Sequence, residues 1–173
     1  MLGPTLPPGP FDQREIEARP DVLSYTSAPL ERAYTVLGAV WVTLHAASSA
    51  SDTDFVARLV DVHPDGRAFP LTDGILRAST RDTYPEPGVV RPVQPSPLRP
   101  DEPCSFCIDL WATGCAFLPG HRIRVDVTSS SHPRWIRHTN TFGDQIDATG
   151  TAVARQHVFH DPQRPSRIHL TVV

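Results

Sequence analysis

Three cysteines and one histidine lie close together in the sequence and could bind a metal ion. Cys104 and Cys107 have the Cys-x2-Cys spacing of many zinc sites, and Cys115 and His121 could complete a set of four ligands. On an extended strand, however, positions 104 and 107 differ by an odd number, so their side chains point to opposite faces. We therefore expect three free thiols and no zinc site, and the sequence assigns these cysteines no other role.

Two aspartates just before a predicted strand are candidates for a calcium site. Asp52 and Asp54 could offer their carboxylate oxygens to the hard Ca²⁺ ion. Alternatively, they accept hydrogen bonds from backbone N–H groups of the loop or pair with an arginine. We favour this structural role, and the sequence predicts no cofactor. The histidines, of which His157 and His160 are also an odd number of residues apart, are expected at surface or turn positions.

A serine nucleophile has no recognisable setting in this sequence. The α/β-hydrolases present theirs in a Gly-x-Ser-x-Gly elbow, and none of the ten glycines has a serine two positions later. Ser129, Ser130 and Ser131 follow a strand without a glycine scaffold and are expected to bind backbone groups of a turn. A phosphate-binding Gly-x-x-x-x-Gly-Lys motif is excluded because the sequence contains no lysine. We predict that this chain alone has no catalytic activity.

Composition narrows the classes of partner. The 173 residues carry a formal net charge of −3, all 16 basic residues are arginines, and no basic run occurs. Nucleic-acid binding is therefore not expected. The sequence has no apolar stretch of about 18 residues, so we expect no membrane span. Its N-terminus has neither a positively charged region nor an apolar region after it, so we expect no signal peptide. An odd number of cysteines suits free thiols in a reducing compartment, so we expect a cytoplasmic protein.

The elements that position these residues are predicted to be strands. Nineteen prolines disfavour long helices, whereas apolar residues recur with a period of two in several segments. The pattern begins at Val22, and its segments include 36–44, 55–62, 75–78, 105–112, 123–127, 151–159 and 167–172. Turn residues occur at 63–66, 72–74 and 119–120. Residues 80–103 and 129–150 are predicted loops. On this pattern Trp41 and Trp111 are expected to be buried, and Asp126 to join a solvated ladder of charges with nearby arginines.

Eight or nine strands joined by well-formed turns are typical of an antiparallel β-sandwich. We predict an all-β fold, specifically an antiparallel jelly roll over residues 21–173. Residues 1–20 contain five prolines around a charged stretch and resemble a linker. No internal repeat is visible, so one domain follows this linker-like segment.

Six segments occur in an order that is characteristic of one known family. They are residues 21–30 (DVLSYTSAPL), 52–67 (DTDFVARLVDVHPDGR), 73–77 (DGILR), 108–113 (IDLWAT), 119–131 (PGHRIRVDVTSSS) and 160–167 (HDPQRPSR). Together they resemble the C-terminal domain of the X-Pro dipeptidyl-peptidase and cocaine-esterase family of hydrolases, also called CocE/NonD. The resemblance extends from residue 12 to the last residue.

This resemblance implies a galactose-binding-like jelly roll that is not itself catalytic. In the family a Ser-His-Asp triad belongs to a preceding α/β-hydrolase domain with a helical cap, so no catalytic residue carries over to this chain. The implied role is to pack on such a hydrolase domain, in the same chain or a separate one, and to help wall its active site. The family's reactions are dipeptidyl-peptidase cleavage and the hydrolysis of acyl esters or amides, and the sequence does not specify the substrate.

Family-like segments at strand ends indicate the surface that would face the hydrolase domain. The candidates are Phe55, Asp73, Ile75, Arg77 and Trp135. Left uncovered, such an apolar surface should drive weak self-association, most simply into a two-fold dimer. The alternative function is a free-standing jelly roll that binds carbohydrate or another small ligand. Such binders expose aromatic side chains on a concave face, and a test of glycan binding separates the two functions.

Overall fold

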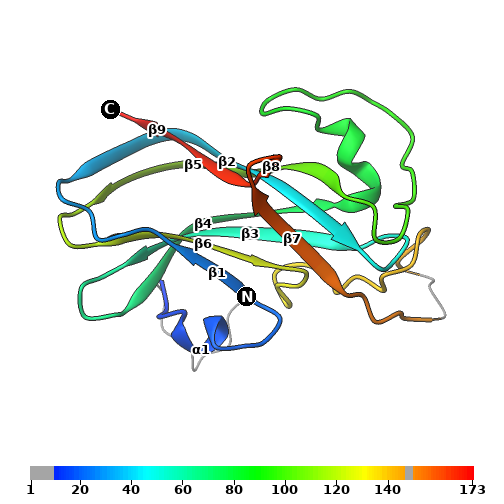
Figure 1. Cartoon of the computed structure of the whole chain (residues 1–173), viewed down its shortest axis with the longest axis horizontal. Helices are drawn as coiled ribbons and strands as arrows, with labels where there is room; N and C mark the ends of the chain where they lie inside the picture. The colour runs from blue at the N-terminus through cyan, green and yellow to red at the C-terminus, as the bar shows by residue number, and fades with distance from the viewer. Residues whose placement is uncertain (1–9, 147–149) are drawn as a thin grey trace.

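The chain folds into two antiparallel β-sheets that face each other (Figure 1). The computed structural model describes residues 10–146 and 150–173. The first sheet has the order β1-β6-β3-β4, with β1 (Leu23–Thr26), β6 (Arg122–Thr128), β3 (Asp54–Val62) and β4 (Ala68–Arg77). The second contains β5 (Cys104–Phe117), β2 (Tyr34–Ser48), β7 (Gln156–Asp161), β8 (Arg164–Pro165) and β9 (Arg167–Val172). The predicted all-β antiparallel sandwich is confirmed, while the jelly-roll topology and the likeness to galactose-binding domains stay predictions.

The longest strand, β2, is the spine of the second sheet. It pairs with β5 along one edge and with β9 and β7 along the other. Its alternate residues Val36, Val40, Val42 and Leu44 are buried in the core between the sheets. They meet buried residues of other strands, namely Phe55, Ala57, Leu59, Leu76, Phe106, Ile108, Leu110, Phe117 and Val127. Each fully buried aliphatic or aromatic side chain of this size stabilises the fold by about 1.5–3 kcal/mol.

The two sheets approach each other closely where β4 lies against β5. A Cβ atom on Gly74 would lie 1.9 Å from the backbone oxygen of Asp109, so only glycine fits there. At the same place the hydroxyl of Thr72 donates a hydrogen bond to the carbonyl oxygen of Leu110. Residues 72–74 are thus an interior part of β4. The turn predicted there is wrong, because the glycine permits a close approach of two strands instead of a reversal of the chain.

The segment before β1 lies against the outer face of the first sheet. Its short helix α1 (Arg14–Glu17) ends with Glu17, which forms an ion pair with Arg124 of β6. Asp126, also on β6, is 3% exposed and accepts a hydrogen bond of 2.6 Å from the hydroxyl of Ser24. Burial raises the pKa of this carboxyl. The prediction of a solvated Asp126 is therefore wrong, because Ser24 of β1 and the segment around α1 cover this part of β6.

The connections agree with the predicted loops in outline. After β4 the short 3₁₀ helix η1 (Ala78–Thr83) begins the proline-rich stretch, and β7 begins at Gln156 instead of residue 151. Its partner β2 ends at Ser48, opposite Gln156, so earlier residues have no strand to pair with. Residues 1–9 and 147–149, which belong to the predicted linker and loop, lie outside the described residues. No helix among the described residues is long and apolar enough to cross a membrane.

Candidate functional site

An exposed aromatic groove, here called the tryptophan groove, lies beside β4, β5 and η1. It encloses about 400 Å³. Its lining residues are Ile75, Leu76, Arg77, Thr80, Tyr84, Cys107, Asp109, Trp111 and Trp135. The side chain of Trp111 is 70% exposed and that of Tyr84 is 42% exposed. Large aromatic side chains that are gathered in one exposed groove mark a docking or binding surface.

A β-bulge explains why Trp111 is exposed. The pairing of β2 with β5 shifts between Ala39 and Trp41, so β5 has one extra residue at this point. Trp111 consequently adopts a φ of 65°, and its backbone N–H donates a 2.7 Å hydrogen bond to the Asp109 carboxylate. This left-handed conformation is costly for a bulky residue. The expectation of a buried Trp111 is wrong, because the bulge interrupts the alternation on which it rested.

The tryptophan groove contains three of the five residues predicted for the interface with a hydrolase domain. Ile75, Arg77 and Trp135 line it, although they come from β4 and from a distant loop. Asp73 lies next to the groove and forms an ion pair with Arg134, with 3.0 Å between the carboxylate oxygen and the guanidinium nitrogen. The guanidinium of Arg134 in turn lies 4.8 Å from the ring centroid of Trp135, so it holds the tryptophan loop against β4.

The prediction that Phe55 is an interface residue is wrong. Its side chain is 1% exposed and packs against Phe106 with 4.7 Å between ring centroids. It therefore belongs to the core and offers no surface to another domain. The position looked like a strand end in the sequence, but β3 begins at Asp54 and Phe55 already points between the sheets.

The two calcium candidates are bound to groups of the protein. One oxygen of Asp52 accepts hydrogen bonds of 2.9 Å from the backbone N–H groups of Thr53 and Ser79, and the other lies 3.5 Å from Nε2 of His138. Burial alone would raise the pKa of Asp52, but these hydrogen bonds hold it below its usual value. Asp54 lies 3.4 Å from Nε of Arg77, and burial raises its pKa. These contacts are the ones expected for the structural alternative.

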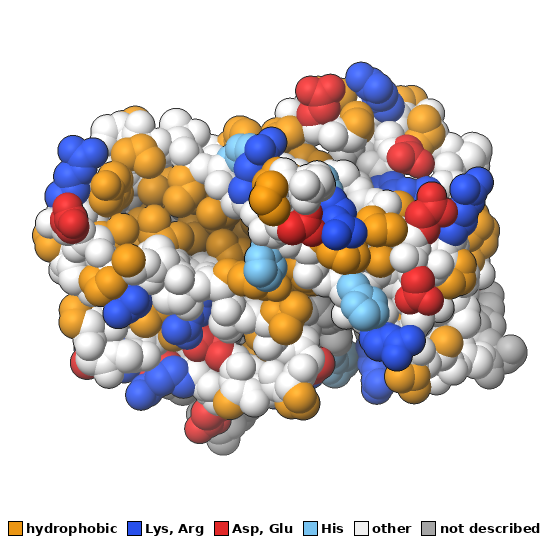
Figure 2. All heavy atoms as spheres, viewed as in Figure 1, with side chains coloured by type: hydrophobic (Ala, Val, Ile, Leu, Met, Phe, Trp, Pro, Cys, Tyr) orange, Lys and Arg blue, Asp and Glu red, His pale blue; other side chains and the backbone are white. Residues whose placement is uncertain are grey.

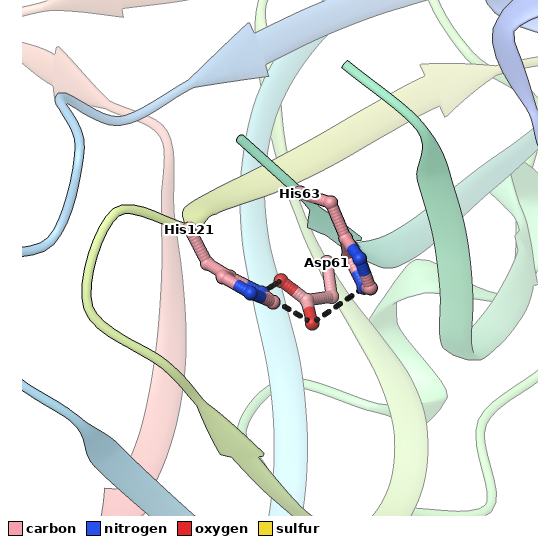
Figure 3. Close-up of side chains that lie close together, drawn as sticks. All are labelled: Asp61, His63 and His121. Carbon is pink, nitrogen blue, oxygen red and sulfur yellow. Dashed lines mark hydrogen bonds and ion pairs between the residues drawn. The ribbon is translucent and has the colours of Figure 1, made fainter. Parts of the chain in front are cut away.

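A second aspartate–histidine cluster lies at the other end of β3 (Figure 3). The two carboxylate oxygens of Asp61 lie 2.9 and 3.0 Å from Nδ1 of His121, and one lies 3.6 Å from Nε2 of His63. The two imidazole rings are 4.4 Å apart at their centroids. The sequence analysis did not identify this cluster. The Asp-x-His spacing at 61 and 63 was a usable signal, since residues two apart on a strand share a face.

The cysteines are not brought into one metal site. All three are free thiols, and burial raises the pKa of each: Cys104, Cys107 and Cys115. Cys107 lines the tryptophan groove. His121, which was considered as their fourth ligand, instead pairs with Asp61.

A second groove, the inter-sheet groove, opens between the two sheets where β1 and β6 face β2, β7 and β9. It encloses about 410 Å³ and is visible as an apolar hollow in Figure 2. Most of its lining is aliphatic: Val42, Leu44, Ile123, Val125, Val127, Val158, Ile168 and Leu170. Polar groups at its border include Tyr25, His160 and Arg167. The groove therefore continues the hydrophobic core to the surface.

Comparison with known proteins finds relatives along almost the whole chain. Residues 5–169 match the family described as the X-Pro dipeptidyl-peptidase C-terminal non-catalytic domain. Cocaine esterase from Rhodococcus sp. (strain MB1 Bresler) is 44% identical over 169 residues, which are 95% of this chain and 28% of that protein.

Solved structures agree with the sequence relatives. An alpha-amino acid ester hydrolase has a TM-score of 0.86 and 33% identity over 95% of this chain and 27% of its own. An aminopeptidase from a marine sediment archaeon (Thaumarchaeota archaeon) has a TM-score of 0.85 and 31% identity over 95% of this chain and 28% of its own. The chain thus spans less than a third of the length of the relatives it matches.

Proposed function

The chain belongs to the X-Pro dipeptidyl-peptidase C-terminal non-catalytic domain family, and we propose that it packs on an α/β-hydrolase domain and helps to wall that domain's active site. The resemblance noted in the sequence is confirmed by this membership. The relatives are much longer proteins in which the matching part is only 27–28% of the chain. Such a proportion fits a module that works beside a larger catalytic part.

The tryptophan groove is the observation that carries this proposal. Its lining combines the aromatic residues Trp111, Trp135 and Tyr84 with the charged residues Arg77 and Asp109. Aromatic side chains surrounded by polar groups are the usual composition of the strongest part of a protein–protein interface. A strained conformation at exposed Trp111 also favours a functional role, because the strain has no benefit for folding.

The chemistry is proposed to reside entirely in the partner domain. This chain lacks the Gly-x-Ser-x-Gly elbow, and without an activated nucleophile and its base the barrier to acyl transfer is hardly lowered. The relatives are named for the hydrolysis of esters or the removal of amino acids. We therefore assign the partner to hydrolases that cleave acyl esters, amides or X-Pro peptide bonds.

A hybrid enzyme tests the docking role. This chain would replace the matching C-terminal part of the Rhodococcus cocaine esterase, and ester hydrolysis and thermal stability would be measured. We expect an active hybrid. Trp111→Ala should lower its activity or its melting temperature strongly, since truncation of an interface anchor costs about 2 kcal/mol or more.

The matched control is Leu37→Ala in the same hybrid. Leu37 is also exposed but lies outside the tryptophan groove, so this change should have little effect. Equal effects of the two substitutions would place the docking surface elsewhere. Ester turnover by the isolated chain, abolished by a serine-directed inhibitor, would contradict the non-catalytic role.

The inter-sheet groove favours a second candidate function, the binding of a small apolar ligand. Its volume of about 410 Å³ lies within the range of ligand pockets, roughly 300–1,000 Å³. The aliphatic lining suits a hydrocarbon or aromatic group better than a sugar, which needs many hydrogen bonds. An environment-sensitive apolar dye, displaced by fatty or aromatic acids, tests this function. Glycan binding without displacement of the dye would favour a carbohydrate ligand instead.

Two further properties remain part of the proposal. Without a hydrolase domain on the tryptophan groove, this chain should form a weak two-fold dimer that buries the exposed tryptophans. Sedimentation at increasing concentration tests it. A cytoplasmic location is supported by the three free thiols, because a reducing compartment preserves them.

A further inference from the structure

We propose that Asp61, His63 and His121 form a binding site for one divalent transition-metal ion, with zinc as the best fit. Among the described residues this is the group in which at least three potential ligand atoms lie within 4.8 Å of one another. The inference is independent of the docking role, because the cluster lies at the other end of β3 from the Asp54–Arg77 pair beside the tryptophan groove.

The distances between the ligand atoms agree with a zinc site. Nδ1 of His121 lies 2.9 Å from one oxygen of Asp61, and Nε2 of His63 lies 3.6 Å from the other. In a tetrahedral site with bonds of about 2.1 Å, neighbouring ligand atoms are separated by about 3.4 Å. An ion can therefore enter between the three groups with small rotations of their side chains (Figure 3).

The backbone holds the two histidines in place. The N–H of His63 donates to the carbonyl oxygen of Arg67 at 2.8 Å, and its own carbonyl oxygen accepts from Gly66 at 2.9 Å. The N–H of His121 donates to Leu118 at 3.1 Å, and its carbonyl oxygen accepts from Leu30 at 2.8 Å. Two separate turns thus present their imidazoles to one strand, which is the preorganisation that tight metal binding needs.

The charge of Asp61 also points to a cation. Within residues 10–146 and 150–173, the ion-pair partners of Asp61 are His63 and His121, without an arginine. By contrast, Asp65 and Asp73 each pair with at least one arginine. The side chain of Asp61 is 12% exposed and faces two imidazoles. The carboxylate offers a negative charge to an incoming ion, and the imidazoles offer two nitrogen ligands.

The donor set selects the type of metal. Two imidazole nitrogens and one carboxylate oxygen suit zinc and related transition metals, whereas calcium and magnesium require mainly oxygen ligands. The side chain of His63 is 30% exposed, which leaves a route in from solvent and a coordination position for water. The site is therefore of the open type with three protein ligands.

Zinc titration of the full chain tests the proposal. We expect one Zn²⁺ ion per chain and a higher melting temperature with zinc, but no such effect with Ca²⁺. His63→Gln should weaken zinc binding at least about tenfold, since even the loss of a group that merely orients a ligand costs 10–100-fold. His157→Gln, at an exposed histidine outside the cluster, should leave the affinity unchanged.

The substitutions separate this site from other modes of binding. Because His63 is partly exposed, the His63→Gln variant should fold normally, as measured by circular dichroism. A substitution at the buried His121 could prevent folding, and for this reason it is not the main test. Cobalt in place of zinc should give a tetrahedral absorption band that His63→Gln removes. No binding at micromolar zinc would overturn the proposal, and so would equal affinity in His63→Gln, which would indicate binding to the free thiols instead.

Discussion

Each end of β3 has an aspartate beside a histidine, but the two ends differ in exposure to solvent. The end at Asp52 is buried and is called the closed end, and the end at Asp61 is partly exposed and is called the open end. Before its first residue, Asp52 meets His138, and both side chains are 1% exposed. Near its last residue, Asp61 meets His121 and also His63, which is reached by solvent. At the first end Asp52 also binds two backbone N–H groups. At the second end the side-chain partners of the carboxylate among the described residues are the two imidazoles.

This difference separates a structural brace from a binding site. Nδ1 of His138 accepts a hydrogen bond from the backbone N–H of Asn140 at 2.8 Å, so Nε2 carries the proton and faces Asp52. At this end Asp52 thus faces an imidazole N–H and the backbone N–H groups of Thr53 and Ser79. At the open end the same two residue types form the cluster proposed above as a metal site. Burial alone does not decide whether an aspartate is structural or binds a ligand. The partners of its carboxylate decide it.

The largest effect should follow from removing the brace. Asp52→Ala leaves a buried histidine and two backbone N–H groups without their partner, and breaking a buried pair costs about 3–5 kcal/mol. We expect a correspondingly lower free energy of unfolding in urea. A loss below about 1 kcal/mol would mean that water replaces the carboxylate, and the first end of β3 would not be closed.

The same change at the open end should cost less. Asp61→Ala removes a partner from His63 and His121, which can reach water through the exposed side of the cluster, so we expect about 1–3 kcal/mol. Urea unfolding of both variants in parallel makes the comparison. A larger loss for Asp61→Ala than for Asp52→Ala would reverse the assignment of the two ends. Zinc should stabilise the wild type but not this variant.

The pH dependence distinguishes neighbouring carboxylates at the closed end. The pKa of Asp52 is lowered, so its contribution to stability is present above the unfolded value of 3.8 and is lost as the pH falls through the lower folded value. Asp52→Asn should therefore lower the melting temperature at pH 7, and the difference from wild type should shrink on acidification. A constant difference at every pH would show that the charge of Asp52 is irrelevant.

Asp54→Asn is the matched control for this experiment. Burial raises the pKa of Asp54, so its ionised form weakens the fold above pH 3.8. The neutral amide should keep or raise the melting temperature at pH 7, and the difference should vanish at low pH. A clear loss of stability at pH 7 would mean that the pair with Arg77 outweighs the burial of the charge.

The smallest change in stability is expected at the tryptophan groove. Trp111→Gly relieves the positive φ, and the gain is partly offset by the flexibility of glycine, so we expect stabilisation of about 0.5 kcal/mol. Docking in the hybrid enzyme should be lost in the same variant. A protein destabilised by more than about 1 kcal/mol would show that Trp111 is part of the fold instead of the interface.

Much of the fold followed from local patterns. The period of two placed β3 and β9 within one residue of their observed bounds, because alternation reports directly which residues share a face. The order of the family-like segments also led to the correct family. Alternation does not report what covers each face, and for this reason Asp126 was placed in solvent. It equally cannot reveal the single extra residue that turns Trp111 outward.

The amino-acid sequence by itself determined that this protein is an antiparallel sandwich of a non-catalytic family, since both follow from residues that are close along the chain. Only the tertiary structure decided which residues meet. Asp61 and His121 are 60 residues apart and become neighbours because β3 pairs with β6 in one particular register. Ile75 and Trp135 meet in the tryptophan groove in the same way, through the packing of a loop against β4. Sites built from distant residues depend on strand register and on packing, and the alternation of residues along the sequence reports neither of them.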